Sequence, residues 1–157
     1  MPTERTIVFF VPGIPGTAGS KRGFVNPKTK RVIIVDDNRK AAPWRQSVLA
    51  AAMRIYTDVP LTGPVVLTAH FYFPRPKCHY GSGRNADVLK DGAPRHHITK
   101  PDATKLLRAL EDALTAVIWR DDNQVVEQHV EKMYGPRPGV LVTISTKGSS
   151  AQNGGVE

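Results

Sequence analysis

The chain has 157 residues and a net charge of +8, with 22 lysines and arginines against 14 aspartates and glutamates. This length fits one domain with its own core, and a hydrophobic fraction of 40% excludes a natively disordered chain. The single cysteine, Cys78, excludes an internal disulfide framework and a cysteine-rich zinc module. A positive surplus of this size favours a polyanionic partner, of which nucleic acid is the commonest.

Hydrophobic periodicity divides the chain into short strands and two helices. Alternating apolar residues mark the strands, and apolar residues at three- and four-residue spacing mark the helices. The predicted strands cover residues 6–11, 23–25, 32–35, 65–73, 124–134 and 140–145, and the predicted helices cover 37–56 and 101–118. Strands at both ends with two separated helices indicate an α+β domain over residues 1–146, with a mixed or antiparallel sheet of five to six strands and two main helices packed on it. A disordered tail is expected over 147–157, which is poor in apolar residues.

Residues 75–99 show no period of either kind, and so long a segment in a compact domain is usually functional or mobile. Most of its charges are basic, so a flexible DNA-facing loop is expected. Tyr80 could stack there on an unpaired base, although an exposed loop tyrosine usually has no such role. Cys78-His79 and His96-His97 suggest a zinc site, but adjacent ligands seldom fit one tetrahedral ion and the spacing matches no known finger.

The carboxylates around the second helix are the candidate chemical groups. Asp102 precedes the helix and Asp121 and Asp122 follow it, so they meet only if the chain returns along the helix. A structural explanation competes with this one. Thr99-x-x-Asp102 matches a helix capping box, and Asp121-Asp122-Asn123 is typical of a solvated turn. From the pattern alone, the structural explanation is stronger than a metal site.

The segment HITKPDATKLLRALEDALTAVIWRDDNQVVEQHVEKMYG resembles the core signature of the RusA family of Holliday-junction resolvases. That signature reads approximately K-P-D-x-D-(N/K)-L-x-(K/R)-x-x-x-D-A-L, followed by an apolar-aromatic stretch ending in D-D-x-Q-V. The match is colinear, and the order of elements before it also fits, so the resemblance covers most of the chain. It implies a small α+β homodimer with one Mg²⁺-dependent active site per subunit, which nicks two strands of a four-way DNA junction symmetrically.

The resemblance also implies the site residues, position by position. Asp102 matches the first metal-binding aspartate and Asp122 the late one, with Asp121 as its neighbour. Arg108 falls where the family has a lysine or arginine thought to support catalysis. The expected catalytic residues are therefore Asp102, Arg108, Asp121 and Asp122, with the three aspartates as ligands of Mg²⁺, for which Mn²⁺ is a substitute. The D-A-L triplet is matched by residues 112–114.

Thr104 departs from the signature, because it stands where the family has its second aspartate. Mg²⁺ is usually held by one or two carboxylates together with waters and phosphate, so Asp102 and Asp122 could still hold one ion. Arg108 or Lys105 would then offset the negative charge that grows on the reacting phosphate. Retained endonuclease activity is expected. One alternative is a weak or inactive protein that binds branched DNA, and another is an unrelated globular protein whose acids cap helices.

Basic residues near the acidic site are expected to contact DNA, because the carboxylates alone would repel it. The expected DNA-binding residues are Lys21, Arg22, Arg95, His97, Lys100 and Lys105. A solvated hairpin is the alternative for the first two. The sequence thus predicts a homodimeric, structure-selective endodeoxyribonuclease that resolves four-way junctions in DNA recombination and repair. No apolar run reaches the roughly 18 residues of a membrane span and no signal-peptide pattern is present, so a bacterial cytoplasmic or phage-encoded protein is expected.

Overall fold

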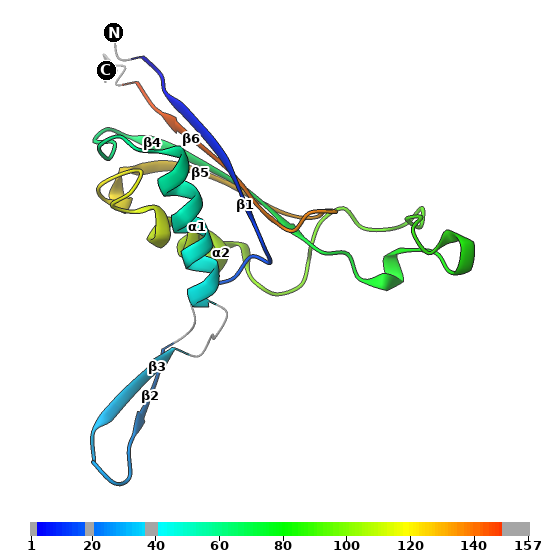
Figure 1. Ribbon diagram of the computed structural model, residues 1–157, viewed down its shortest axis with the longest axis horizontal. Helices are drawn as coiled ribbons and strands as arrows, with labels where there is room; N and C mark the ends of the chain where they lie inside the picture. Colours follow the sequence, from blue (N-terminus) through cyan, green and yellow to red (C-terminus); the bar gives the residue numbers. More distant parts are fainter. Residues whose placement is uncertain (1–2, 18–20, 37–40, 149–157) are drawn as a thin grey trace, which may run out of the picture.

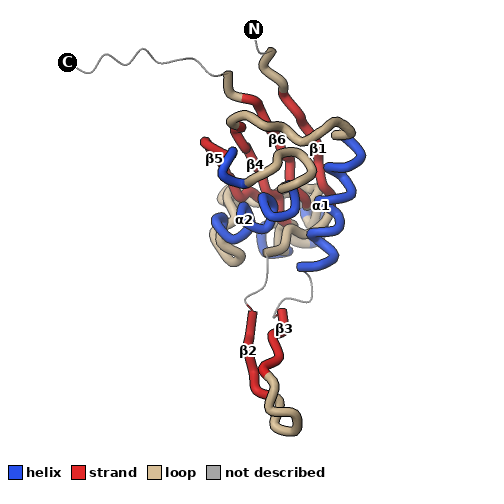
Figure 2. Tube along the Cα trace, turned by 90° about the vertical axis from the view of Figure 1, so that its left-hand side faces the viewer, coloured by secondary structure: helices blue, strands red, loops and turns tan. Residues whose placement is uncertain are grey.

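The computed structural model describes residues 3–17, 21–36 and 41–148. Its body is one mixed sheet with two helices on one face (Figures 1 and 2). The elements are β1 (Thr6–Pro12), β4 (Val65–Phe73), β5 (Val125–Tyr134) and β6 (Gly139–Thr146), with α1 (Ala41–Ile55) and α2 (Ala103–Leu114). The strand order is β1-β6-β4-β5, in which only β4 and β5 are parallel. This arrangement confirms the predicted α+β class with two main helices.

Strand alternation places the core between the sheet and the helices. In β4 every second residue from Val65 to Phe73 is buried and the residues between them are half-buried. On α2 the buried residues form a single stripe: Leu106, Leu107, Leu110, Ala113 and Leu114. The leucine stripe therefore faces the sheet, and the charged side of α2 faces solvent. No helix within the described ranges is long and apolar enough to cross a bilayer.

The predicted hairpin forms, but its strands do not join the main sheet. β2 (Lys21–Val25) and β3 (Val32–Asp36) pair only with each other as a separate two-stranded sheet, which lies away from the body in both views (Figures 1 and 2). The prediction of five to six strands in one sheet was therefore too high, since four of the six strands form the body. Two predicted regions, the start of the first helix at 37–40 and the tail at 149–157, lie outside the described residues.

The segment expected to lack regular structure is folded locally. It contains two 3-10 turns, η1 (Lys77–His79) and η2 (Gly83–Asn85), and Tyr80 pairs with Leu89 in a short bridge. The guanidinium of Arg75 closes the base of the segment by donating to the Pro94 carbonyl at 2.7 Å. Periodicity could not predict this fold, because isolated turns and single bridges leave no repeating pattern in the sequence.

The second helix ends four residues earlier than predicted, and this early end creates the site described below. Ala116 has a φ of 71°, in the left-handed region, and its N–H donates to the Trp119 carbonyl at 2.7 Å. The indole of Trp119 is fully buried and donates from Nε1 to the Thr115 hydroxyl at 3.1 Å. This tight turn reverses the chain, so the residues that follow Trp119 return to the C-terminal end of α2.

Candidate active site

The turn that carries the two adjacent aspartates is held by one side chain. In η3 (Asp122–Gln124), the Oε1 atom of Gln124 accepts from the backbone N–H groups of Arg120 and Asp121 at 2.8 and 2.9 Å. Its Nε2 atom donates to the carbonyls of Leu61 and Gly63 at 2.8 and 2.9 Å. The amide of Gln124 thus uses both its donors and its acceptor, and it ties the acidic turn to the segment before β4.

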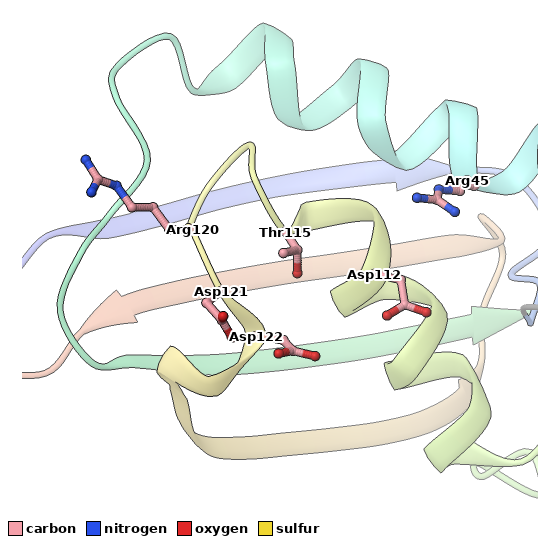
Figure 3. A pocket seen from close by; sticks show the side chains of 6 residues that line it. All are labelled: Arg45, Asp112, Thr115, Arg120, Asp121 and Asp122. Carbon is pink, nitrogen blue, oxygen red and sulfur yellow. The ribbon is translucent and has the colours of Figure 1, made fainter.

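Three carboxylates line one open pocket of about 320 Å³ at the C-terminal end of α2. Its lining residues are Arg45, Asp112, Thr115, Arg120, Asp121 and Asp122 (Figure 3). The carboxylate of Asp121 caps η3 by accepting from the Asn123 N–H at 2.9 Å, which confirms a structural role for that residue. Asp112 and Asp122 are exposed, and they are the carboxylates of the pocket with no such capping role.

The electrostatics of this end of α2 show how closely the acids lie. Glu111, one residue before Asp112, has its pKa raised, mainly because burial disfavours its charged form. A hydrogen bond from the Gln128 amide opposes that rise, and the negative charges of Asp122 and Asp112 add to it. A cation or a cationic side chain in the pocket would relieve this repulsion.

Asp102 lies at the other end of α2 from this pocket. It is the N-cap residue of the helix, but its side chain makes no capping hydrogen bond, so the capping-box explanation is wrong for this carboxylate. The side chain of Asp102 is 65% exposed, and the Nζ atom of Lys105 lies 3.7 Å from its Oδ2 atom. Asp112 follows Asp102 by ten positions along the helix, which corresponds to about 15 Å along the axis. Asp102 is not among the residues that line the pocket of Asp122, and the convergence of these two carboxylates on one ion stays a prediction.

The remaining predicted residues fall in three places. Lys105 and Arg108 lie on the solvent face of α2, between Asp102 and the pocket. Lys100 and Arg95 are exposed in the segment that leads into α2, and this segment is attached to β5 by the bond from the Tyr134 N–H to the Arg95 carbonyl at 2.9 Å. The side chains of Lys21 and Arg22 lie outside the described part of the chain.

His97 is buried, with 9% of its surface exposed, and its ring stacks on Phe73 with 4.1 Å between the centroids. Its Nε2 lies 3.1 Å from the Thr99 hydroxyl, and its Nδ1 is a buried atom with no hydrogen-bond partner in the described structure. The side chain is therefore not available for the phosphate contact that the sequence suggested. Burial lowers the pKa of His97, and the charge of Lys132 lowers it further.

This lowered pKa predicts acid sensitivity of the fold. In the unfolded chain the imidazole of His97 takes up a proton near its ordinary pKa of 6.5, whereas in the folded protein its pKa lies lower. The free energy of unfolding therefore falls as the pH drops through 6.5, because protonation favours the unfolded chain. His97→Phe keeps a stacked ring and is expected to flatten the dependence. Urea midpoints for both proteins at about pH 8 and about pH 5.5 measure the difference. An equal acid-induced loss in both proteins would contradict this role.

Among residues 3–17, 21–36 and 41–148, no group of three or more His, Cys, Asp or Glu side chains is already arranged to hold a metal ion. The suggested zinc site from Cys78, His79, His96 and His97 is therefore not formed. The acidic pocket nevertheless offers the hard carboxylate oxygens that Mg²⁺ and Mn²⁺ prefer, on exposed side chains that can rotate. The donor set fits such an ion, which Asp112 and Asp122 could hold.

Sequence reasoning missed three residues of this site. Asp112 was matched only as part of the D-A-L triplet, although its position after Leu110 on a strongly patterned helix placed it on the solvent face. The glutamine in D-D-x-Q-V was quoted in the signature, but two of its four hydrogen bonds cross from η3 to the carbonyls of residues 61 and 63 and leave no local pattern. Arg45 comes from α1, about 70 residues away, and no motif marked it.

Comparison with known proteins agrees with the resemblance seen in the sequence. A family model described as Endodeoxyribonuclease RusA matches residues 14–145. The chain is also 33% identical over 139 residues to "Uncharacterized protein YqaN" of Bacillus subtilis (strain 168), a match that covers 88% of this chain and 94% of that protein. The matched region includes both helices, the acidic turn and every residue that lines the pocket. The chain therefore belongs to the RusA endodeoxyribonuclease family.

Proposed function

We propose that this protein is a structure-selective endodeoxyribonuclease that resolves four-way DNA junctions by metal-dependent, symmetric nicking. It works as a homodimer in DNA recombination and repair, in a bacterial cytoplasm or on behalf of a phage. The observation that carries the proposal is the pocket in which Asp112, Asp121 and Asp122 lie together, at one end of the helix that bears the family signature. A net charge of +8 supports a DNA substrate.

Mg²⁺, with Mn²⁺ as a substitute, is the cofactor of this proposal, and Asp112, Asp121 and Asp122 would hold it. When bound, such an ion supplies charge neutralisation at the phosphate and lowers the pKa of a coordinated water. The protein's own part is to hold the phosphate and to keep the acidic turn in place through Gln124 and Trp119. Lys105 and Arg108 bind neighbouring phosphates along the solvent face of α2.

A dimer explains how Asp102 takes part. Within one protomer Asp102 lies about 15 Å along α2 from Asp112, too far for a shared ion. A two-fold axis that places two α2 helices side by side in opposite directions sets Asp102 of one protomer beside the pocket of its partner. Each of the two sites then combines acids from both chains. The DNA arms that lead away from the junction are contacted by four basic residues: Lys21, Arg22, Arg95 and Lys100.

Cleavage of a synthetic four-way junction tests the proposed function directly. The junction and a linear duplex of the same sequence are incubated with the protein and Mg²⁺, and the nicks are mapped on all four strands. Paired nicks at symmetric positions in two opposed strands are expected, with the duplex uncut. Omission of the metal should abolish the nicks. Equal cutting of both substrates, or nicks without symmetry, would contradict the proposal.

A second candidate rests on Thr104, which lacks the carboxylate of the family signature. Thr104 is exposed in the first turn of α2, at the same end as Asp102. If the missing acid limits catalysis, the native protein binds junctions but cuts them slowly. Thr104→Asp should then raise the single-turnover cleavage rate. An unchanged rate in this variant would show that the threonine is not what limits cleavage.

A further inference from the structure

Arg45 is a cationic side chain that enters the acidic pocket from a different part of the chain. It lies on α1, whereas Asp112, Asp121 and Asp122 belong to α2 and the turn after it. Figure 3 shows Arg45 on the opposite side of the pocket from Asp121 and Asp122. The other arginine of the lining, Arg120, extends away from these carboxylates in the same view. Arg45 is therefore the guanidinium placed to face a ligand that the acids hold.

The packing of α1 fixes the direction in which Arg45 points. The preceding residue, Trp44, is buried and packs over Gly13 and Gly16, where an added Cβ would lie 3.5 Å from the indole in both cases. Val48 and Ala52, one and two turns later, are fully buried. These anchors set the rotation of α1, and α1 packs against α2. Arg45 is consequently held on the exposed side of the helix, next to the pocket.

Arg45 also has free hydrogen-bonding capacity. It makes no ion pair within 4.0 Å with any carboxylate in the described part of the chain, although Asp112 lines the same pocket. An arginine that faces acids without pairing to them leaves its five donors available to a ligand. The planar guanidinium matches two oxygens of a phosphate, and arginine keeps its charge at every relevant pH.

We propose that Arg45 is a catalytic residue that binds a non-bridging oxygen of the scissile phosphate. This inference rests on the proposed endonuclease function. In the hydrolysis, a water oxygen forms a bond to phosphorus, and the bond from phosphorus to one sugar oxygen breaks. The water gives up a proton, and the departing oxygen takes one. Arg45 keeps its own protons and stabilises the charge that accumulates on the phosphate oxygens in the transition state.

Three variants separate this role from a general effect of charge. Arg45→Ala should slow single-turnover cleavage of a four-way junction by about 100-fold, and Arg45→Lys should recover part of that loss. The matched control is Arg54→Ala, which removes an exposed arginine near the other end of α1, outside the pocket. The control should cleave at the wild-type rate. Adding guanidinium ion at low, non-denaturing concentration should partly rescue Arg45→Ala and leave Arg54→Ala unchanged.

A second readout does not depend on cleavage. Junction binding is measured in EDTA at several salt concentrations, and the slope of log K against log salt is compared between Arg45→Ala and the wild type. The slope for Arg45→Ala should be shallower by the amount that corresponds to about one phosphate contact. Cleavage by Arg45→Ala at the rate of Arg54→Ala, with an unchanged salt dependence, would overturn the inference. That result leaves the proposed function intact if Asp122→Asn is inactive. If the wild-type protein does not cleave junctions at all, the proposed function itself fails.

Discussion

Asp122→Asn is expected to lower the rate of four-way junction cleavage by at least about 100-fold, because it removes a negative oxygen from the proposed hydrolytic pocket. Junction binding should be unchanged or tighter, since the substitution removes a charge that repels the DNA backbone. The pocket is exposed and Asp122 caps nothing, so the fold should keep its stability. Single-turnover cleavage and equilibrium binding, measured on the same junction, test both parts.

Two further variants make this test specific. Asp112→Asn should behave in the same way, because Asp112 lines the same pocket from α2. Asp91→Asn removes an exposed aspartate outside the pocket and should retain wild-type cleavage. If Asp122→Asn cleaves the junction as fast as Asp91→Asn does, the acidic pocket is not the hydrolytic centre.

Trp119→Ala is expected to lower the free energy of unfolding by about 3–5 kcal/mol. Trp119 is the largest fully buried side chain, and its deletion leaves a cavity beneath the turn that ends α2. The substitution also removes the indole N–H that donates to the Thr115 hydroxyl. Urea unfolding at neutral pH measures the loss. A change below about 1 kcal/mol would contradict the assignment of this side chain to the core.

Milder substitutions at the same contact separate packing from hydrogen bonding. Trp119→Phe keeps an aromatic ring but loses the indole donor, so it should be less destabilising than Trp119→Ala. Thr115→Val removes the acceptor and leaves the indole N–H unpaired, at a cost of about 1–3 kcal/mol. Because the acidic turn follows Trp119 directly, Trp119→Phe should also slow cleavage under conditions where it remains folded.

Local patterns were sufficient for the elements that pack by one face. The leucine stripe of α2 and the alternation of β4 appear in the structure with the predicted faces buried. An element that buries one face carries apolar residues at the spacing of that face, which is about 3.6 residues in a helix and two in a strand. The end of α2 was missed because its turn contains no glycine or proline. Instead, Ala116 takes a positive φ while Trp119 fills the core beneath it. Such a turn depends on tertiary packing, which no window of sequence contains.

The site was predicted only in part, for a related reason. The aspartate pair of the turn and the helix before it were identified from the family signature, and both reach the pocket region. Arg45 and the contacts of Gln124 with residues 61 and 63 depend on long-range packing, so no local spacing indicates them. The expected convergence of Asp102 with Asp122 stays a prediction, because Asp102 is the N-cap residue of α2 and does not line the pocket that contains Asp122.

The account depends on acids from opposite ends of α2 acting on one phosphate, with each end supplied by a different protomer. Purified heterodimers test this arrangement. A dimer of one Asp102→Asn chain and one Asp122→Asn chain keeps one complete shared site, and it should nick a single strand at roughly half the wild-type rate. A dimer of one wild-type chain and one chain with both substitutions keeps no complete shared site and should be inactive. The opposite pattern, with activity only in the second heterodimer, would contradict the account.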